Sequence, residues 1–175
     1  MTAAAEVQVL ISAEEIGRKV RELGARIAAD AAGAPVHLVG VLKGSFVFMA
    51  DLARAIPGEV TCDFLRVASY RGTRSTGEVR FEMDLTEPIQ GLHVVLVEDI
   101  VDTGTTVDAL VRLLRARGPA SLRVCTLLHK PARSKVPVTL DYCGFTIPDR
   151  FVVGYGLDVD GRLRQLPYVG VMEGV

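Results

Sequence analysis

Apolar residues follow two different spacings along the chain, and each spacing predicts a different kind of element. Segments rich in apolar and β-branched residues indicate strands, several of them buried on both faces. These segments are residues 36–42, 60–67, 94–97, 121–128 and 138–147. Apolar residues spaced by three and four indicate helices from Ser12 to near Gly33, from 46 to 55, and from Thr106 to near Gly118. We therefore predict an α/β fold with a twisted, mainly parallel sheet and helices on both faces.

The first helix has a recognisable start and end. Ser12 is a favourable N-cap residue, and Glu15 three positions later completes a capping box. Gly33 and Pro35 indicate where the helix ends. We expect this helix to serve packing.

The stretch from Val94 to Thr106 is the most informative part of the chain. Its apolar strand is followed by three carboxylates within five positions, those of Glu98, Asp99 and Asp102. A small turn of three threonines and one glycine comes next, and helical spacing resumes after it. We interpret the stretch as a strand, an acidic loop and a helix start.

The small turn at residues 103–106 suits a phosphate group. Backbone N–H groups at a helix start point outward without partners, and Gly104 lets the backbone approach a ligand closely. The hydroxyls of Thr103, Thr105 and Thr106 add further donors. Together with the acids, this turn predicts a phosphorylated sugar held by its hydroxyls, with Mg²⁺. N-capping and turn formation alone would explain only one or two of these polar residues.

Two other segments are less specific. Lys43-Gly44-Ser45 follows the strand at 36–42, and from the residues alone it is either an ordinary tight turn or a second functional turn. The polar stretch at 68–78 is either a surface loop or a lid over an active site. Alternating apolar residues from Val79 to Met83 predict that the chain returns from it as a hairpin strand.

Composition excludes several classes of protein. The chain has 175 residues, which fits one domain, and 49% are hydrophobic, which is ample for one core. A net charge of −1 argues against binding to nucleic acid or to an anionic membrane. Three separated cysteines indicate neither a disulfide framework nor a zinc site, and we expect buried thiols. Neither a signal peptide nor an apolar run of about 20 residues is present, so we expect a cytoplasmic protein.

The run Glu-Asp-Ile-Val-Asp-Thr-Gly at 98–104 resembles the phosphoribosyl-pyrophosphate (PRPP) motif of type I phosphoribosyltransferases, in the form of the bacterial hypoxanthine-guanine branch. The resemblance extends over nearly the whole chain. It implies a single domain, 1–175, with a small hood from the terminal segments over the base. It also implies transfer of a 5-phosphoribosyl group from PRPP to N9 of hypoxanthine or guanine, with Mg²⁺, in a homodimer or homotetramer.

The resemblance also assigns roles to individual residues. Lys43 and Gly44 match the pyrophosphate loop, where the peptide before the lysine is often cis. Arg164 matches an arginine that contacts pyrophosphate. Ser69 and Tyr70 match the Ser-Tyr pair of a flexible lid, about residues 68–80.

Four residues match the family's base site. Lys130 matches the lysine that recognises the oxo group of a 6-oxopurine, which suits an ammonium because it only donates hydrogen bonds. Phe151 matches the aromatic residue that stacks on the purine, and Val152 offers backbone groups to its edge. Asp158 matches an aspartate that reaches a second Mg²⁺.

The expected reaction requires, among other things, that the ribose be held and that the purine lose a proton. Glu98 and Asp99 would bind the ribose hydroxyls or their Mg²⁺. Asp102 is the candidate general base for the proton that leaves the purine; the alternative is that it only caps the following helix. Some relatives carry lysine at the position of Thr105, so phosphate binding leans more on backbone amides here. Arg71 and Arg74, within the predicted lid, receive no role.

Three other functions are alternatives to this one. A phosphoribosyltransferase for xanthine remains open, whereas Lys130 disfavours adenine because it cannot accept a hydrogen bond from an amino group. A PRPP-sensing regulator that binds RNA would need a basic face, which the net charge does not favour. A Rossmann-type nucleotide binder would need a Gly-x-Gly-x-x-Gly run after the first strand, and the sequence has none.

Overall fold

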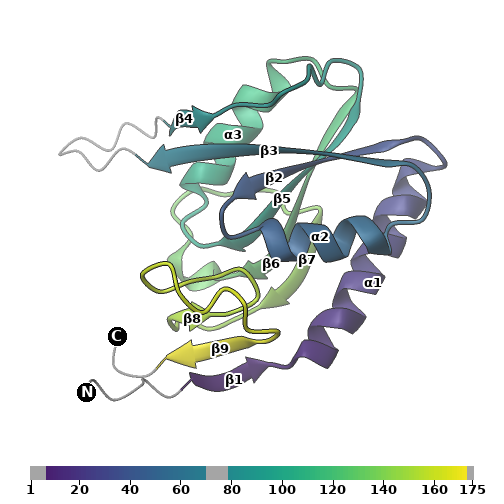
Figure 1. Ribbon diagram of the computed structural model, residues 1–175. Coiled ribbons are helices and arrows are strands. Elements are labelled where there is room, and N and C mark those ends of the chain that lie inside the picture. Colours follow the sequence, from purple (N-terminus) through teal and green to yellow (C-terminus); the bar gives the residue numbers. More distant parts are fainter. Residues whose placement is uncertain (1–6, 70–78, 173–175) are drawn as a thin grey trace.

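A computed structural model of the protein describes residues 7–69 and 79–172. Six strands form its main sheet, in the order β4-β3-β2-β5-β6-β7 (Figure 1). All neighbouring strands are parallel except β3 and β4, which form an antiparallel hairpin. The strands are β2 (Val36–Leu42), β3 (Val60–Ser69), β4 (Val79–Met83), β5 (His93–Val101), β6 (Ser121–His129) and β7 (Tyr142–Thr146).

Helices cover both faces of this sheet, as predicted. They are α1 (Ala13–Ala31), α2 (Phe46–Ala55), α3 (Thr105–Arg115) and the short 3-10 turn η1 (Pro131–Arg133). The apolar side chains of α1 and α2, such as Leu23 and Leu52, form one core with one face of the sheet. Those of α3, such as Leu110, form a second core with the other face. Among the described residues, no helix is both long and apolar enough to span a membrane.

The two ends of the described chain form a small second sheet. Its three strands, in the order β1-β9-β8, are β1 (Val7–Ile11), β8 (Val152–Val153) and β9 (Val169–Met172). Figure 1 shows that this sheet brings the N-terminal strand beside the last strand of the chain. The predicted hood from the terminal segments is therefore confirmed, although the pattern analysis had not identified β1.

The predicted bounds hold well for the first half of the chain. β2 and α2 occupy the expected residues, and Ser12 and Glu15 form the predicted capping box at the start of α1. The return strand after the polar stretch is β4, which pairs with the end of β3. Of the predicted lid at 68–80, Tyr70 and the rest of 70–78 lie outside the described residues; Ser69 ends β3.

Three predictions were wrong. Glu98 and Asp99 lie in β5 and not in a loop, because pairing with β6 continues as far as Val101. The last strand of the sheet starts at Tyr142 and not at 138, since β6 pairs with it only from there. Cys62 is exposed, because β4 pairs only with the far end of β3 and leaves this part of β3 at the edge of the sheet.

Asp63 holds the connection between β4 and β5 against the sheet. Its carboxylate is 7% exposed and accepts hydrogen bonds from the N–H groups of Phe64, Thr86 and Glu87 and from the Thr86 hydroxyl. Burial acts to raise the pKa of Asp63, but these hydrogen bonds outweigh it and hold the pKa below its usual value of 3.8. The ionised form is therefore the one that the fold stabilises.

We predict that Asp63→Asn lowers the free energy of unfolding by about 1–3 kcal/mol, because the amide cannot accept all of these hydrogen bonds. The difference from the wild type should be constant at neutral pH and should shrink as the pH falls below 3.8, where Asp63 becomes protonated. Urea unfolding at several pH values measures it. Asp160→Asn, at an exposed turn, is the control. A variant as stable as the wild type at pH 7 would contradict the prediction.

Candidate active site

The carboxyl ends of three neighbouring strands bring most of the predicted site residues to one edge of the sheet. β2 leads into Lys43 and Gly44, β5 carries the acids, and β6 leads into Lys130. Because these strands are parallel and adjacent, residues far apart in sequence end at the same level. This edge is where open α/β sheets bind ligands.

Two adjacent carboxylates lie at the end of β5, that of Glu98 buried and that of Asp99 partly exposed. Glu98 is 7% exposed and lies opposite Thr126 of β6. Burial, and next the charge of Asp99, raise the pKa of Glu98 well above its usual value. Burial also raises the pKa of Asp99, although the Ile100 N–H, which donates to Asp99 over 2.8 Å, and the charge of Arg164 act against it. A cation at this position would relieve the cost of burying both charges.

Gly44 lets the loop after β2 approach these acids. A side-chain carbon at Gly44 would overlap the Asp99 carboxylate, so any larger residue would have to displace that carboxylate. The peptide between Leu42 and Lys43 is cis. Lys43 itself is exposed at this edge.

The turn that precedes α3 has the form predicted for a phosphate seat. Gly104 has a φ of +81°, and the Val136 carbonyl occupies the space that a side chain there would need. Thr103 Oγ1 accepts a hydrogen bond from the Thr105 N–H at 3.4 Å. Gly104 is the N-cap of α3 and no side chain caps this helix, so Asp102 does not have the capping role that was its alternative. Thr105 and Thr106 begin the helix, where N–H groups face outward.

Asp102 lies beside a cation that the sequence analysis did not identify. The Nε atom of Arg133 is 3.2 Å from Asp102 Oδ1, yet that oxygen is buried and has no hydrogen-bond partner among the described residues. The ion pair therefore lacks hydrogen-bond geometry. The only signal in the sequence is an arginine three positions after Lys130, which alone predicts nothing.

Lys130 is buried although it carries a charge. The residue is 6% exposed, and its backbone N–H donates to the Val101 carbonyl at 2.9 Å. Its side-chain Nζ lies 3.8 Å from Asp149 Oδ1. Phe151, two residues after Asp149, is 41% exposed. Val152 is buried at the start of β8. A buried ammonium near an exposed aromatic ring is an arrangement that suits a flat, polar base.

Asp158 and Arg164 form an ion pair at 2.7 Å. Arg164 Nη1 also donates to the Gly156 carbonyl at 2.6 Å, and Gly156 packs so tightly against the Gly44 carbonyl that no side chain fits between them. Arg164 is thereby held near the loop that follows β2. Asp158 also accepts the Gly161 N–H at 2.7 Å and so stabilises a turn.

The acids at the end of β5 do not by themselves form a complete metal-binding site. Among the described residues, no group of three or more His, Cys, Asp or Glu side chains gathers as a metal site. The fit to Mg²⁺ rests instead on Glu98 and Asp99, which supply adjacent hard oxygen ligands and carry a repulsion that a cation relieves. Mg²⁺ commonly keeps waters and substrate oxygens and needs only one or two carboxylates.

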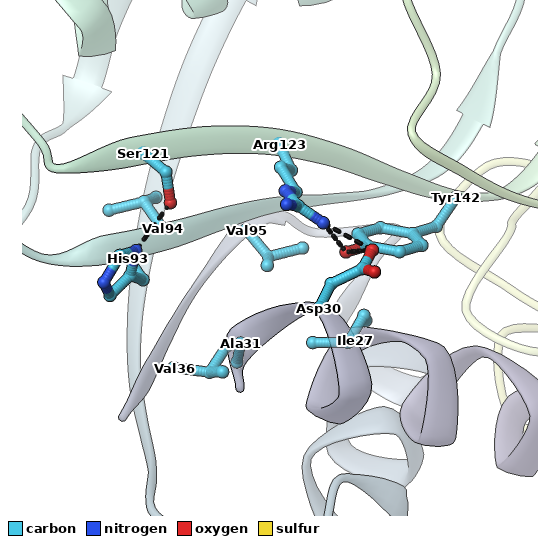
Figure 2. A pocket seen from close by; sticks show the side chains of 10 residues that line it. All are labelled: Ile27, Asp30, Ala31, Val36, His93, Val94, Val95, Ser121, Arg123 and Tyr142. Atoms are coloured by element: carbon cyan, nitrogen blue, oxygen red, sulfur yellow. Dashed lines mark hydrogen bonds and ion pairs between the residues drawn. The ribbon is translucent and has the colours of Figure 1, made fainter. Parts of the chain in front are cut away.

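A cavity of about 140 Å³ lies at the opposite, amino edge of the main sheet (Figure 2). Its polar side chains satisfy one another. Arg123 donates to the Tyr142 hydroxyl at 2.7 Å, which donates to Asp30 at 2.7 Å, and His93 Nδ1 lies 2.9 Å from Ser121 Oγ. This network explains the polar lining as structural, and the predicted site residues lie at the other edge.

Comparisons with known proteins agree with the geometry. The family model of the phosphoribosyl transferase domain matches residues 10–160. The hypoxanthine-guanine phosphoribosyltransferase of Streptococcus pneumoniae is 46% identical over 95% of this chain and 93% of its own, and that of Bacillus subtilis is 45% identical with the same coverage. A crystal structure of a hypoxanthine-guanine phosphoribosyltransferase from Bacillus anthracis is 44% identical, covers 95% of this chain and 99% of its own, and has a TM-score of 0.92.

We predict that Glu98→Gln stabilises the ligand-free protein at pH 8 by about 0.5–2 kcal/mol, because it removes a buried charge held next to Asp99. Since the pKa of Glu98 is raised in the folded state, ionisation destabilises the fold only as the pH rises above 4.5. The gain should therefore vanish near pH 4.5. Denaturant unfolding with a chelator present measures it.

The exposed residue Glu59 provides the matched control, since Glu59→Gln should change stability little at either pH. A Glu98→Gln variant that is less stable than the wild type at pH 8 would show that the buried charge of Glu98 does not destabilise the fold.

Proposed function

This chain belongs to the phosphoribosyl transferase domain family, and we propose that it transfers the 5-phosphoribosyl group of PRPP to N9 of hypoxanthine or guanine. The products are IMP or GMP and pyrophosphate, as in purine salvage. The observation that supports this most directly is the meeting, at one sheet edge, of the buried acids of β5, the threonine turn and the buried ammonium of Lys130.

The sugar end of PRPP would lie over the end of β5. The outward N–H groups and hydroxyls of residues 103–106 would hold the 5-phosphate. Glu98 and Asp99 would hold the ribose hydroxyls directly or through Mg²⁺, with Asp158 as a further ligand on the pyrophosphate side. The metal, when bound, supplies positive charge that stabilises the leaving pyrophosphate.

The leaving pyrophosphate requires neutralisation by the protein as well. Lys43, the backbone at Gly44 and Arg164 would do this, which is supported by the hydrogen bond that holds Arg164 to Gly156, next to the loop that carries Gly44. Donors fixed before the reaction stabilise charge as it develops. The lid residues Ser69 and Tyr70 would exclude water from the reactive sugar carbon.

The base would lie between the end of β6 and the hood. Lys130 donates to the 6-oxo group, Phe151 stacks on the ring and the backbone of Val152 contacts its edge. As the bond from C1′ to N9 forms and the bond from C1′ to the pyrophosphate oxygen breaks, the purine gives up a proton. Asp102 accepts that proton, because its side chain is 35% exposed at this edge of the sheet.

Other properties belong to the same proposal. We propose a homodimer or homotetramer that acts in the cytoplasm on small molecules and requires neither nucleic acid nor a membrane. Xanthine remains a candidate third base, because it carries the same 6-oxo group. A PRPP-sensing RNA regulator on this fold is the second candidate function. Only the acids of β5 and the threonine turn at 103–106, which would bind PRPP in either case, favour it.

We predict pyrophosphate release from PRPP and Mg²⁺ with hypoxanthine and guanine, and little with adenine, because the buried Lys130 ammonium can only donate. Asp102→Asn should lower kcat by about 100-fold or more, the scale of general base catalysis. A coupled pyrophosphate assay with hypoxanthine, guanine, xanthine and adenine, each offered separately, measures both effects. No turnover with any base would favour the regulator, whereas full activity of the variant would remove only Asp102 from its role.

A further inference from the structure

Four alternating charges link the two side chains proposed to act on the base. Asp102 Oδ1 lies 3.2 Å from Arg133 Nε, and Arg133 Nη1 lies 3.8 Å from Asp149 Oδ1. The same Asp149 oxygen lies 3.8 Å from Lys130 Nζ. We call this series, Asp102–Arg133–Asp149–Lys130, the charge chain.

The main chain fixes where Arg133 lies. The Lys130 N–H donates to the Val101 carbonyl at 2.9 Å, and the N–H groups of Lys135 and Val136 donate to the Thr103 carbonyl at 2.9 and 3.1 Å. These bonds tie residues 130–136 to β5 on both sides of Asp102. Arg133 lies in the η1 turn between the two attachment points. Its proximity to Asp102 therefore follows from the backbone and not from a chance surface contact.

The geometry of the pair with Asp102 suits a proton acceptor. A buried carboxylate oxygen without compensation is costly, and the Arg133 guanidinium supplies the opposite charge. Oδ1 is the buried atom, whereas the Asp102 side chain as a whole is 35% exposed. The guanidinium therefore compensates and directs the buried oxygen and leaves the exposed part of the side chain to meet a purine N–H.

Asp149 connects Arg133 to Lys130 in the charge chain. Its side chain is 51% exposed, while that of Lys130 is only 8% exposed, so Asp149 approaches the buried ammonium from the solvent side. One oxygen of Asp149 faces both cations. A displacement of Arg133 would therefore be felt at Lys130 as well as at Asp102.

We propose that Arg133 is a positioning residue for the base chemistry: it compensates and directs Asp102, and through Asp149 it is coupled to the placement of Lys130. The proposal rests on the proposed function, because it assigns Asp102 and Lys130 to the base. It predicts that loss of Arg133 impairs the step at the base and leaves PRPP binding intact.

The test compares Arg133→Gln, Arg133→Lys and a matched control in steady-state kinetics with hypoxanthine. Arg112→Gln is the control, because Arg112 forms a similar half-exposed ion pair with Asp108 at 3.0 Å, in α3. Arg133→Gln should lower kcat by about 10- to 100-fold, the scale of a misplaced reacting group, with the KM for PRPP unchanged. Arg133→Lys should recover part of kcat because it restores the charge, and the control should match the wild type.

A double-mutant cycle separates positioning from general stability. If Arg133 acts through Asp102, Arg133→Gln should change kcat by less than about twofold in the Asp102→Asn background. Equal losses in both backgrounds, or no better activity for the lysine variant than for the glutamine variant, would overturn the proposal. An inactive wild type would instead overturn the proposed function and this inference with it. An active wild type with an unimpaired Arg133→Gln variant would overturn the inference alone.

Discussion

The position of two adjacent carboxylates at the end of β5, one of them buried, is the constraint on which the rest of the site depends. Strand pairing with β6 continues through Glu98 to Val101, so the acids enter a paired, buried environment instead of a solvated loop. Burial raises the pKa of Glu98, which shows that the fold alone does not favour its charge. A ligand that brings positive charge or hydrogen-bond donors would relieve this cost, and the proposed Mg²⁺ and ribose hydroxyls would do so.

The neighbouring backbone is shaped by these acids. Gly44 is required where the loop after β2 meets Asp99, and Gly156 is required where the hood meets Gly44. The three segments therefore stack in order: the Asp99 side chain packs on Gly44, and the Gly44 carbonyl packs on Gly156. The small sheet β1-β9-β8 anchors the hood at its far side. The fold thus brings β5, the loop after β2 and the hood together at these two glycines.

Local pattern was sufficient for elements whose signals are local. The bounds of β2 and α2 and the capping box at Ser12 were predicted correctly, because apolar spacing and cap chemistry act over a few residues. The extension of β5 and the late start of β7 depend on pairing with β6, in which Glu98 lies opposite Thr126 and Tyr142 lies opposite Cys125. These partners are not neighbours along the chain. For the same reason β1 escaped prediction, since its partner β9 lies at the opposite end of the chain.

Residues that end neighbouring parallel strands could be assembled into a site from the sequence, with family resemblance supplying the roles of Lys130 and Arg164. Arg133 and Asp149 could not, because an ion pair across two loops depends on turn geometry that has no sequence pattern.

A crystal structure of the protein with Mg²⁺, hypoxanthine and an unreactive PRPP analogue tests the location of the site most directly. The 5-phosphate should lie within hydrogen-bond distance of the N–H groups of Thr103 to Thr106, with the 6-oxo group on Lys130. A sugar phosphate bound in the amino-edge cavity of Figure 2, or away from the acids of β5, would contradict the assignment of the site.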